Sequence, residues 1–130
     1  MPIIIFLLLF SISLQAEHVQ WYWSYDKAHQ KALKEKKMLM VLLMEDNSKE
    51  SNKVLHTTFI NKEYIKKINE KFISVIVIKD QRQSYPIEML YTMTYPALFF
   101  LNEEELFIGE NIFGNINPKT VKKHLNNLNI

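Results

Sequence analysis

Residues 38–51 read MLMVLLMEDNSKES, an apolar run that stops abruptly at a polar turn. The first seven residues are all apolar, which is the length of a strand and is typical of one buried on both faces of an α/β sheet. The next three residues, EDN, interrupt the run with side chains that cap helices. We therefore expect a helix from about Ser48 to Thr58, so that a buried strand leads directly into a helix N-terminus.

Helical and strand patterns alternate on both sides of this stretch. Before it, Tyr25, Ala28 and Ala32 recur at helical spacing and predict a helix over residues 25–36. After it come, in order, a helix starting near residue 61, a β-branched strand at 73–78, a short helix starting at Pro86, a hairpin of strands at 97–101 and 106–108, and a final helix starting near residue 117. This order predicts an α/β fold of three layers, in which a central mixed sheet of about four strands has helices on both faces.

The composition limits the classes of function. The 130 residues are 48% apolar and carry a net charge of +2, which indicates one globular domain and gives no argument for nucleic acid as a partner. Two glycines cannot build a Gly-rich phosphate loop, and the absence of cysteine excludes disulfides, thiolate catalysis and cysteine metal sites. The four histidines show no metal-ligand spacing. We therefore expect no metal site and no cofactor.

The N-terminus predicts export. Residues 3–14 form a nearly unbroken apolar run that is shorter than the roughly 20 residues of a spanning helix. The run fits the core of a secretory signal, with cleavage after Ala16, although no lysine or arginine precedes it. We expect a signal peptide at 1–16, a domain at 17–130, a periplasmic location and no membrane insertion after cleavage. An uncleaved signal would anchor the protein to the membrane.

Several segments, in this order, resemble the thioredoxin fold, and especially the small exported bacterial proteins related to thiol-disulfide interchange domains. The resembling segments are the opening helix with Trp21, Tyr25, Ala28 and Ala32, the strand 38–44, the turn 47–54, Phe59 and the segment 95–101. The likeness covers about residues 21 to 128. It implies a thioredoxin-like three-layer domain over 17–130.

The resemblance also implies where a site lies. The turn 47–54 stands in the place of the family's C-x-x-C motif, which makes four residues degenerate active-site positions: Ser48, Lys49, Glu50 and Ser51. Pro96 stands in the place of the family's cis-proline. Thr94 and Tyr95 then border a shallow groove beside the turn, and the backbone just before the proline is expected to pair with an extended peptide.

The departure from the family concerns its chemistry. Redox-active members use one thiolate to attack a disulfide and a second cysteine to resolve the mixed disulfide. Two serines cannot store electrons in this way, and serine at a helix start is a good capping residue. A serine hydrolase would need Ser48 or Ser51 beside His56 and Asp46, a spacing that does not bring helical side chains together. We therefore assign no catalytic residue.

These observations favour a redox-inactive binding module in the periplasm, either chaperone-like or a subunit of an assembly. Its partner is expected to be another periplasmic protein or an extended peptide segment held in the groove beside Pro96. One alternative is a component of a thiol-disulfide exchange pathway, and another is a signal-anchored structural protein whose groove is unused. The aromatic residues 21–23 are expected to pack rather than to form a recognition patch.

Overall fold

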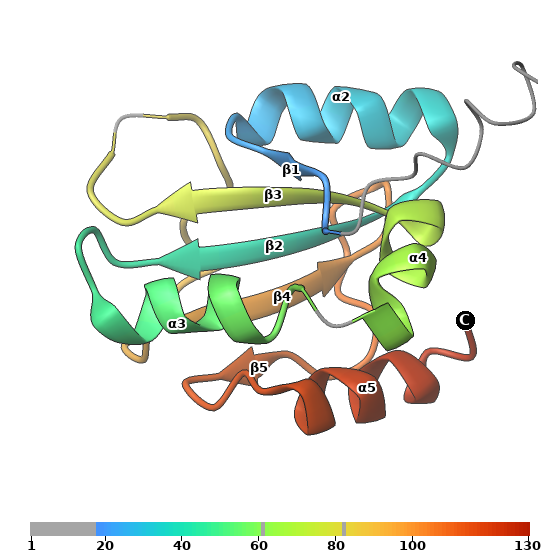
Figure 1. The fold of residues 1–130 in the computed structure, drawn as a ribbon. Helices are drawn as coiled ribbons and strands as arrows, with labels where there is room; N and C mark the ends of the chain where they lie inside the picture. Colours follow the sequence, from blue (N-terminus) through green and yellow to red (C-terminus); the bar gives the residue numbers. More distant parts are fainter. Residues whose placement is uncertain (1–17, 61, 82) are drawn as a thin grey trace, which may run out of the picture.

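The structure, a computed structural model, describes residues 18–60, 62–81 and 83–130. The predicted signal peptide, 1–16, lies outside these residues. The described part forms five strands and four helices, labelled as in Figure 1: β1 (Trp21–Tyr22), α2 (Tyr25–Glu35), β2 (Met38–Met44), α3 (Lys49–Thr57), α4 (Lys62–Lys71), β3 (Phe72–Ile78), β4 (Ala97–Leu101), β5 (Ile112–Phe113) and α5 (Pro118–Asn127). None of these helices is long and apolar enough to span a bilayer.

The strands form one mixed sheet in the order β1-β3-β2-β4-β5. β1, β3 and β2 run parallel, while β4 is antiparallel to both β2 and β5 (Figure 1). The longest ladder joins all seven residues of β2 to β3, in register from Met38 with Phe72 to Met44 with Ile78. The α/β class and the mixed sheet are confirmed, and the sheet has five strands rather than about four.

Alternate residues of the central strands bury against opposite layers of helix. On one face, Leu39, Val41 and Leu43 of β2 pack in the cluster that contains Tyr25, Ala28 and Ala32 of α2. On the other face, Met40 and Leu42 belong to the cluster that α3, α4 and α5 complete. Both sides of β2 are therefore buried, which is the physical reason for its continuous apolar sequence.

Trp21 packs, as expected, and Trp23 does not. The Trp21 ring meets Phe59 edge-on, with centroids 5.0 Å apart and an interplanar angle of 84°. The side chain of Trp23 is 62% exposed. Tyr22 is partly buried against the core on the other face of the sheet, so the aromatic residues at 21–23 supply two packed rings and the short strand β1, which pairs with β3 at the sheet edge.

Two predicted elements are wrong. No helix begins at Pro86, where residues 87–90 form a turn that leaves Ile87 58% exposed. The segment 106–108 is not a strand, because it contributes only a single bridge between Leu101 and Phe107. The backbone N–H groups of Glu104 and Leu106 both donate to Asn102 Oδ1, which closes a turn, and the partner strand of β4 comes later, at 112–113.

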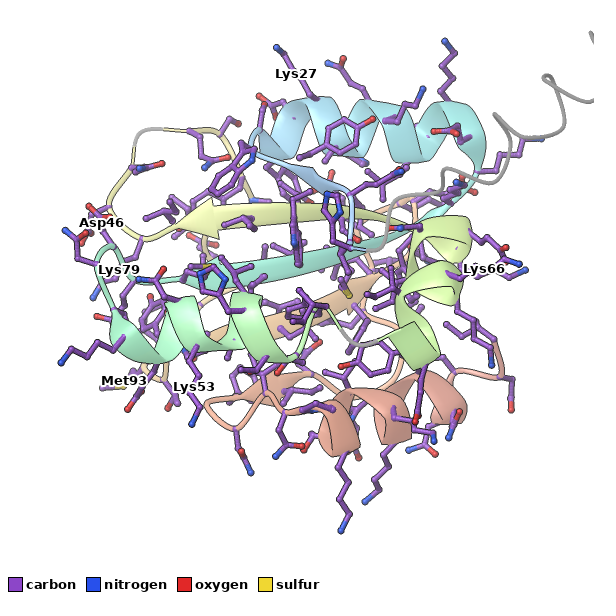
Figure 2. The ribbon with its side chains drawn as sticks, in the orientation of Figure 1. Lys27, Asp46, Lys53, Lys66, Lys79 and Met93 are labelled. Atoms are coloured by element: carbon purple, nitrogen blue, oxygen red, sulfur yellow. The ribbon has the colours of Figure 1, made fainter. Side chains whose placement is uncertain are left out.

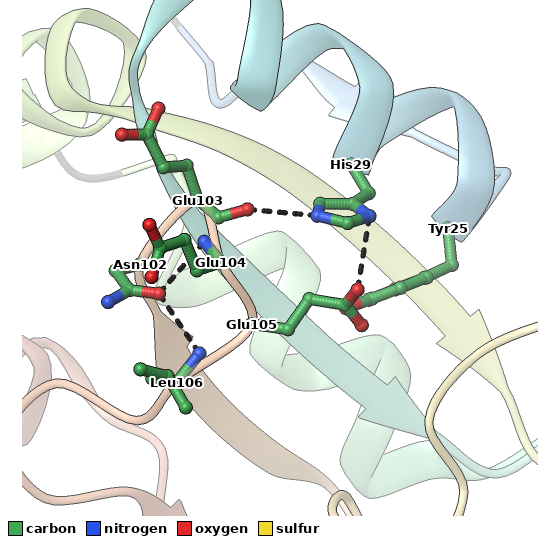
Figure 3. Close-up of polar contacts among 7 residues, drawn as sticks. All are labelled: Tyr25, His29, Asn102, Glu103, Glu104, Glu105 and Leu106. Atoms are coloured by element: carbon green, nitrogen blue, oxygen red, sulfur yellow. Dashed lines mark hydrogen bonds and ion pairs between the residues drawn. The ribbon is translucent and has the colours of Figure 1, made fainter.

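A polar cluster ties this turn to α2 (Figure 3). His29 Nε2 lies 2.9 Å from the carbonyl oxygen of Glu103, and His29 Nδ1 lies 3.2 Å from Glu105 Oε1. The Tyr25 hydroxyl donates to Glu105 Oε2 at 3.0 Å. Both ring nitrogens of His29 therefore face oxygen atoms of the turn. Burial, and then the hydrogen bond and charge of Glu105, raise the pKa of the Tyr25 hydroxyl.

Candidate functional site

Ser48 caps the helix that follows β2. Its backbone is extended, with φ −78° and ψ 128°, and its Oγ accepts a hydrogen bond from the Ser51 backbone N–H at 3.3 Å. Lys49 and Glu50 follow as exposed residues of the first turn. The helix therefore begins at the predicted place, and the serine satisfies one of the N–H groups that a helix start leaves unpaired.

The side chain of Ser51, unlike that of Ser48, points into the protein. The residue is fully buried, and its Oγ has no hydrogen-bond partner within the described part of the chain. A buried hydroxyl without a partner is unfavourable, because it loses water and gains nothing in return. Ser51 therefore occupies an environment that would suit a small apolar group better.

The segment before β4 has the other predicted site residues. The Tyr95–Pro96 peptide bond is cis, as the resemblance implies, and Pro96 is buried. Thr94 is exposed, and its backbone N–H and C=O are both engaged by the Thr92 hydroxyl, at 3.0 and 2.9 Å. By contrast, no hydrogen bond from the described residues occupies the backbone N–H or C=O of Tyr95.

The sheet register brings the two segments to one end of the molecule. The β2–β4 ladder ends with Leu43 opposite Ala97, so Tyr95 and Pro96 lie just beyond the carboxyl end of β2. Ser48 follows that same end of β2 after three intervening residues. Within the described residues no hydrogen bond joins 48–51 to 94–96, and the sheet places both segments at the same end of the molecule.

A hollow of about 290 Å³ opens at this end, beside Tyr95. Its lining comes from the segments that follow β2 and β3: Glu45, Asp46, Lys79, Asp80 and Gln81. The Lys79 backbone N–H donates to the Met44 carbonyl at 2.8 Å and joins the two segments. Figure 2 shows Asp46, Lys79 and Met93 together at one end of the molecule and Lys66 at the other.

Our sequence reasoning missed this hollow. The sequence did contain a signal, because polar residues follow two predicted buried strands, and the carboxyl ends of strands that run parallel, as β2 and β3 do, meet at one edge. Tyr91 and Met93, which are 69% and 86% exposed, add apolar surface in the loop before Tyr95 and were also missed.

The arrangement offers binding groups but no catalytic set. Neither Ser48 nor Ser51 contacts a histidine among the described residues, so no base is in place to activate a hydroxyl. In the same part of the chain, no three or more His, Cys, Asp or Glu residues are grouped so that they could hold a metal ion.

Comparisons with known proteins identify the fold. A scan of family models finds no match, and a search of curated proteins finds none. Solved structures do match: a thioredoxin from Thermus thermophilus superposes with a TM-score of 0.72 at 15% identity, covering 87% of this chain and 88% of that one. The chain has a thioredoxin-like fold.

Two further structures agree with this fold. An oxidoreductase described as DsbH matches with a TM-score of 0.67 at 14% identity, over 91% of this chain and 90% of that one. A poplar thioredoxin h matches with a TM-score of 0.62 at 14% identity, over 87% and 98%. This thioredoxin-like chain differs in having no cysteine, so it has no C-x-x-C motif and cannot itself carry out dithiol-disulfide exchange.

Proposed function

We propose that this chain is a redox-inactive thioredoxin-like module that binds an extended segment of another periplasmic protein in the groove beside Pro96. The observation that carries the proposal is the free backbone of Tyr95. An extended peptide binds a strand-like backbone through main-chain N–H and C=O groups, and these are the groups of Tyr95 that no residue in the described part of the chain pairs with. Thr94 next to it has both groups occupied by Thr92.

Exposed apolar side chains support the same role. Tyr91 and Met93 come shortly before Tyr95 in the chain and are largely exposed. Exposed apolar surface of this kind gains free energy when a partner covers it. The side chains of Ser48, Lys49 and Glu50 supply polar contacts at the other border of the groove, while Ser51 is buried beneath them.

Co-purification from periplasmic extract tests the groove. Tyr95→Pro removes the free N–H donor, and Ser48→Arg places a long charged side chain at the groove border. Lys66→Ala is the control, because Lys66 is exposed at the opposite end of the molecule (Figure 2). We expect both site variants to lose the partner that the wild type and the control recover. Unchanged recovery in both folded site variants would overturn the proposal.

The periplasmic location is a second part of the proposal and is tested separately. It rests on the apolar run at 3–14 and the small residue Ala16. Mass spectrometry of the exported protein should find an N-terminus at Glu17. An intact N-terminus at Met1 would favour the alternative, a signal-anchored protein.

A further inference from the structure

We propose that the ring of Tyr95, with the carboxylates of Glu45 and Asp80 near it, is a subsite for a lysine or arginine side chain of the bound segment, and that Lys79 occupies this subsite in the free protein. The inference rests on the proposed function, because the subsite belongs to the residue whose backbone is to pair with the partner. It adds a preference for segments that carry a positive charge.

Lys79 shows that this ring attracts a cation. Its Nζ lies 5.1 Å from the centroid of the Tyr95 ring, within the distance of about 6 Å at which an ammonium is attracted to an aromatic face. Lys79 is exposed, so its ammonium group can leave the ring and be hydrated by water instead. Its backbone is held at the end of β2 by the hydrogen bond to the Met44 carbonyl, which fixes where the side chain starts.

Two carboxylates act on the same ring. Partial burial, and then the negative charges of Glu45 and Asp80, raise the pKa of the Tyr95 hydroxyl. The geometry agrees, because Glu45 and Asp80 line the same hollow as Lys79, whose ammonium lies over the Tyr95 ring. The negative face of the aromatic ring and the two carboxylates therefore favour the same kind of ligand group, a cation.

The hollow beside the ring has room for such a side chain. Its volume is about 290 Å³, and its lining contains three carboxylates and one ammonium, although the whole chain has a net charge of +2. A cationic side chain that enters can replace Lys79 on the ring, while an anionic one meets the carboxylates. The exposed Tyr91 and Met93 offer apolar contact to the neighbouring residues of the segment.

Peptide binding measured by fluorescence polarisation tests this subsite on the full domain. The probes are three short extended peptides of alternating valine and threonine, identical except for a central lysine, glutamine or glutamate. We expect the lysine peptide to bind about two- to fivefold more tightly than the glutamine peptide, the range of one exposed cation–π contact, and the glutamate peptide to bind most weakly.

Variants then separate the ring from its competitor. Lys79→Ala vacates the ring and is expected to tighten binding of the lysine peptide several-fold. Tyr95→Leu keeps the backbone groups but removes the ring, so it should abolish the advantage of lysine over glutamine. Lys66→Ala, the control at the far end, should leave all three affinities unchanged, and circular dichroism verifies that each variant is folded.

Each outcome has a distinct meaning. If the three peptides bind the wild type equally, or if Lys79→Ala weakens binding of the lysine peptide, the cation subsite is wrong while peptide binding in the groove stands. If none of the peptides binds, the cation subsite is overturned together with the groove on which it rests. Loss of lysine preference in Tyr95→Leu, with glutamine binding retained, supports the subsite specifically.

Discussion

The two serines of the 48–51 turn have opposite effects on stability. Ser51→Ala should raise the free energy of unfolding by about 1 kcal/mol, because it removes a buried hydroxyl that has no partner in the described part of the protein. Ser48→Ala should lower it by about 1 kcal/mol, because the helix loses its N-cap. Urea unfolding of both variants measures the two values. A loss of stability in Ser51→Ala would contradict the assignment of its environment.

Tyr64 should make the free energy of unfolding depend on pH in the alkaline range. Burial, and then the charge of Glu63, raise the pKa of its hydroxyl to about 12, and this hydroxyl donates to the Thr58 carbonyl. An unfolded tyrosine ionises near pH 10, so stability is complete below about pH 10 and falls toward pH 12 by about 1.4 kcal/mol per pH unit for this group.

Tyr64→Phe isolates this contribution. The variant lacks the ionisable hydroxyl, so its stability should fall less steeply between pH 10 and 12 than that of the wild type. Urea unfolding at a series of pH values gives both slopes. Tyr25, whose pKa is also raised, remains in both proteins and contributes equally to each. Identical slopes in the two proteins would show that Tyr64 ionises as freely when folded as when unfolded.

At the scale of elements, the polar cluster in Figure 3 couples α2 to the turn after β4. A double-mutant cycle with His29→Ala and Glu105→Gln should give a coupling free energy of about 0.5–1 kcal/mol, the range for a partly buried pair. The matched pair Lys122 and Glu63, which lie 2.9 Å apart on the surface, should couple less because both are more exposed. Purely additive effects of the His29 and Glu105 substitutions would show that the cluster does not tie the two elements together.

The long buried elements are those that the sequence predicts. β2 and β4 are continuous apolar runs, and β3 is one apart from the buried Ser74, because helices or loops cover both of their faces. β1 and β5 have two residues each, and they are strands only because they pair with β3 and β4. Pairing between distant segments leaves no local pattern, so these two strands were not predicted.

The false helix at Pro86 has a local explanation. Proline at a helix start and apolar residues after it favour a first turn, but one turn fixes several backbone angles for a single hydrogen bond. A helix this short needs packing to persist, and here only one side of the turn packs, because Leu90 is buried while Ile87 and Tyr91 are exposed. Under the proposed function, the same exposure leaves this loop open to the partner beside Tyr95.

At the scale of the whole molecule, the chain has a thioredoxin-like fold but lacks the cysteines that dithiol-disulfide exchange requires. A thioredoxin and an oxidoreductase superpose on this chain, which itself has no cysteine, and at the start of α3 Ser48 caps the helix while Ser51 is buried. The candidate groove was predicted in outline from residues 48–51 and 94–96. The hollow and Lys79 were not, because they depend on side chains from two segments that are distant in sequence.

The absence of thiols predicts no reductase activity. The purified chain should show no disulfide reduction in an insulin assay, since it has no group that forms a mixed disulfide. Replacing both Ser48 and Ser51 by cysteine should introduce measurable turnover, because the first position is at the helix N-terminus, where a thiolate is stabilised, and the second is one turn later. Turnover by the wild-type chain alone would refute the redox-inactive assignment.

The central claim is that the backbone of Tyr95 is a free binding edge. The most direct measurement is an NMR titration of the ¹⁵N-labelled domain with the lysine-centred extended peptide, following the Tyr95 amide signal and its hydrogen exchange. We predict a saturable shift and slower exchange at Tyr95, with the Lys66 amide unchanged. An unshifted, unprotected Tyr95 amide at saturating peptide would contradict the claim.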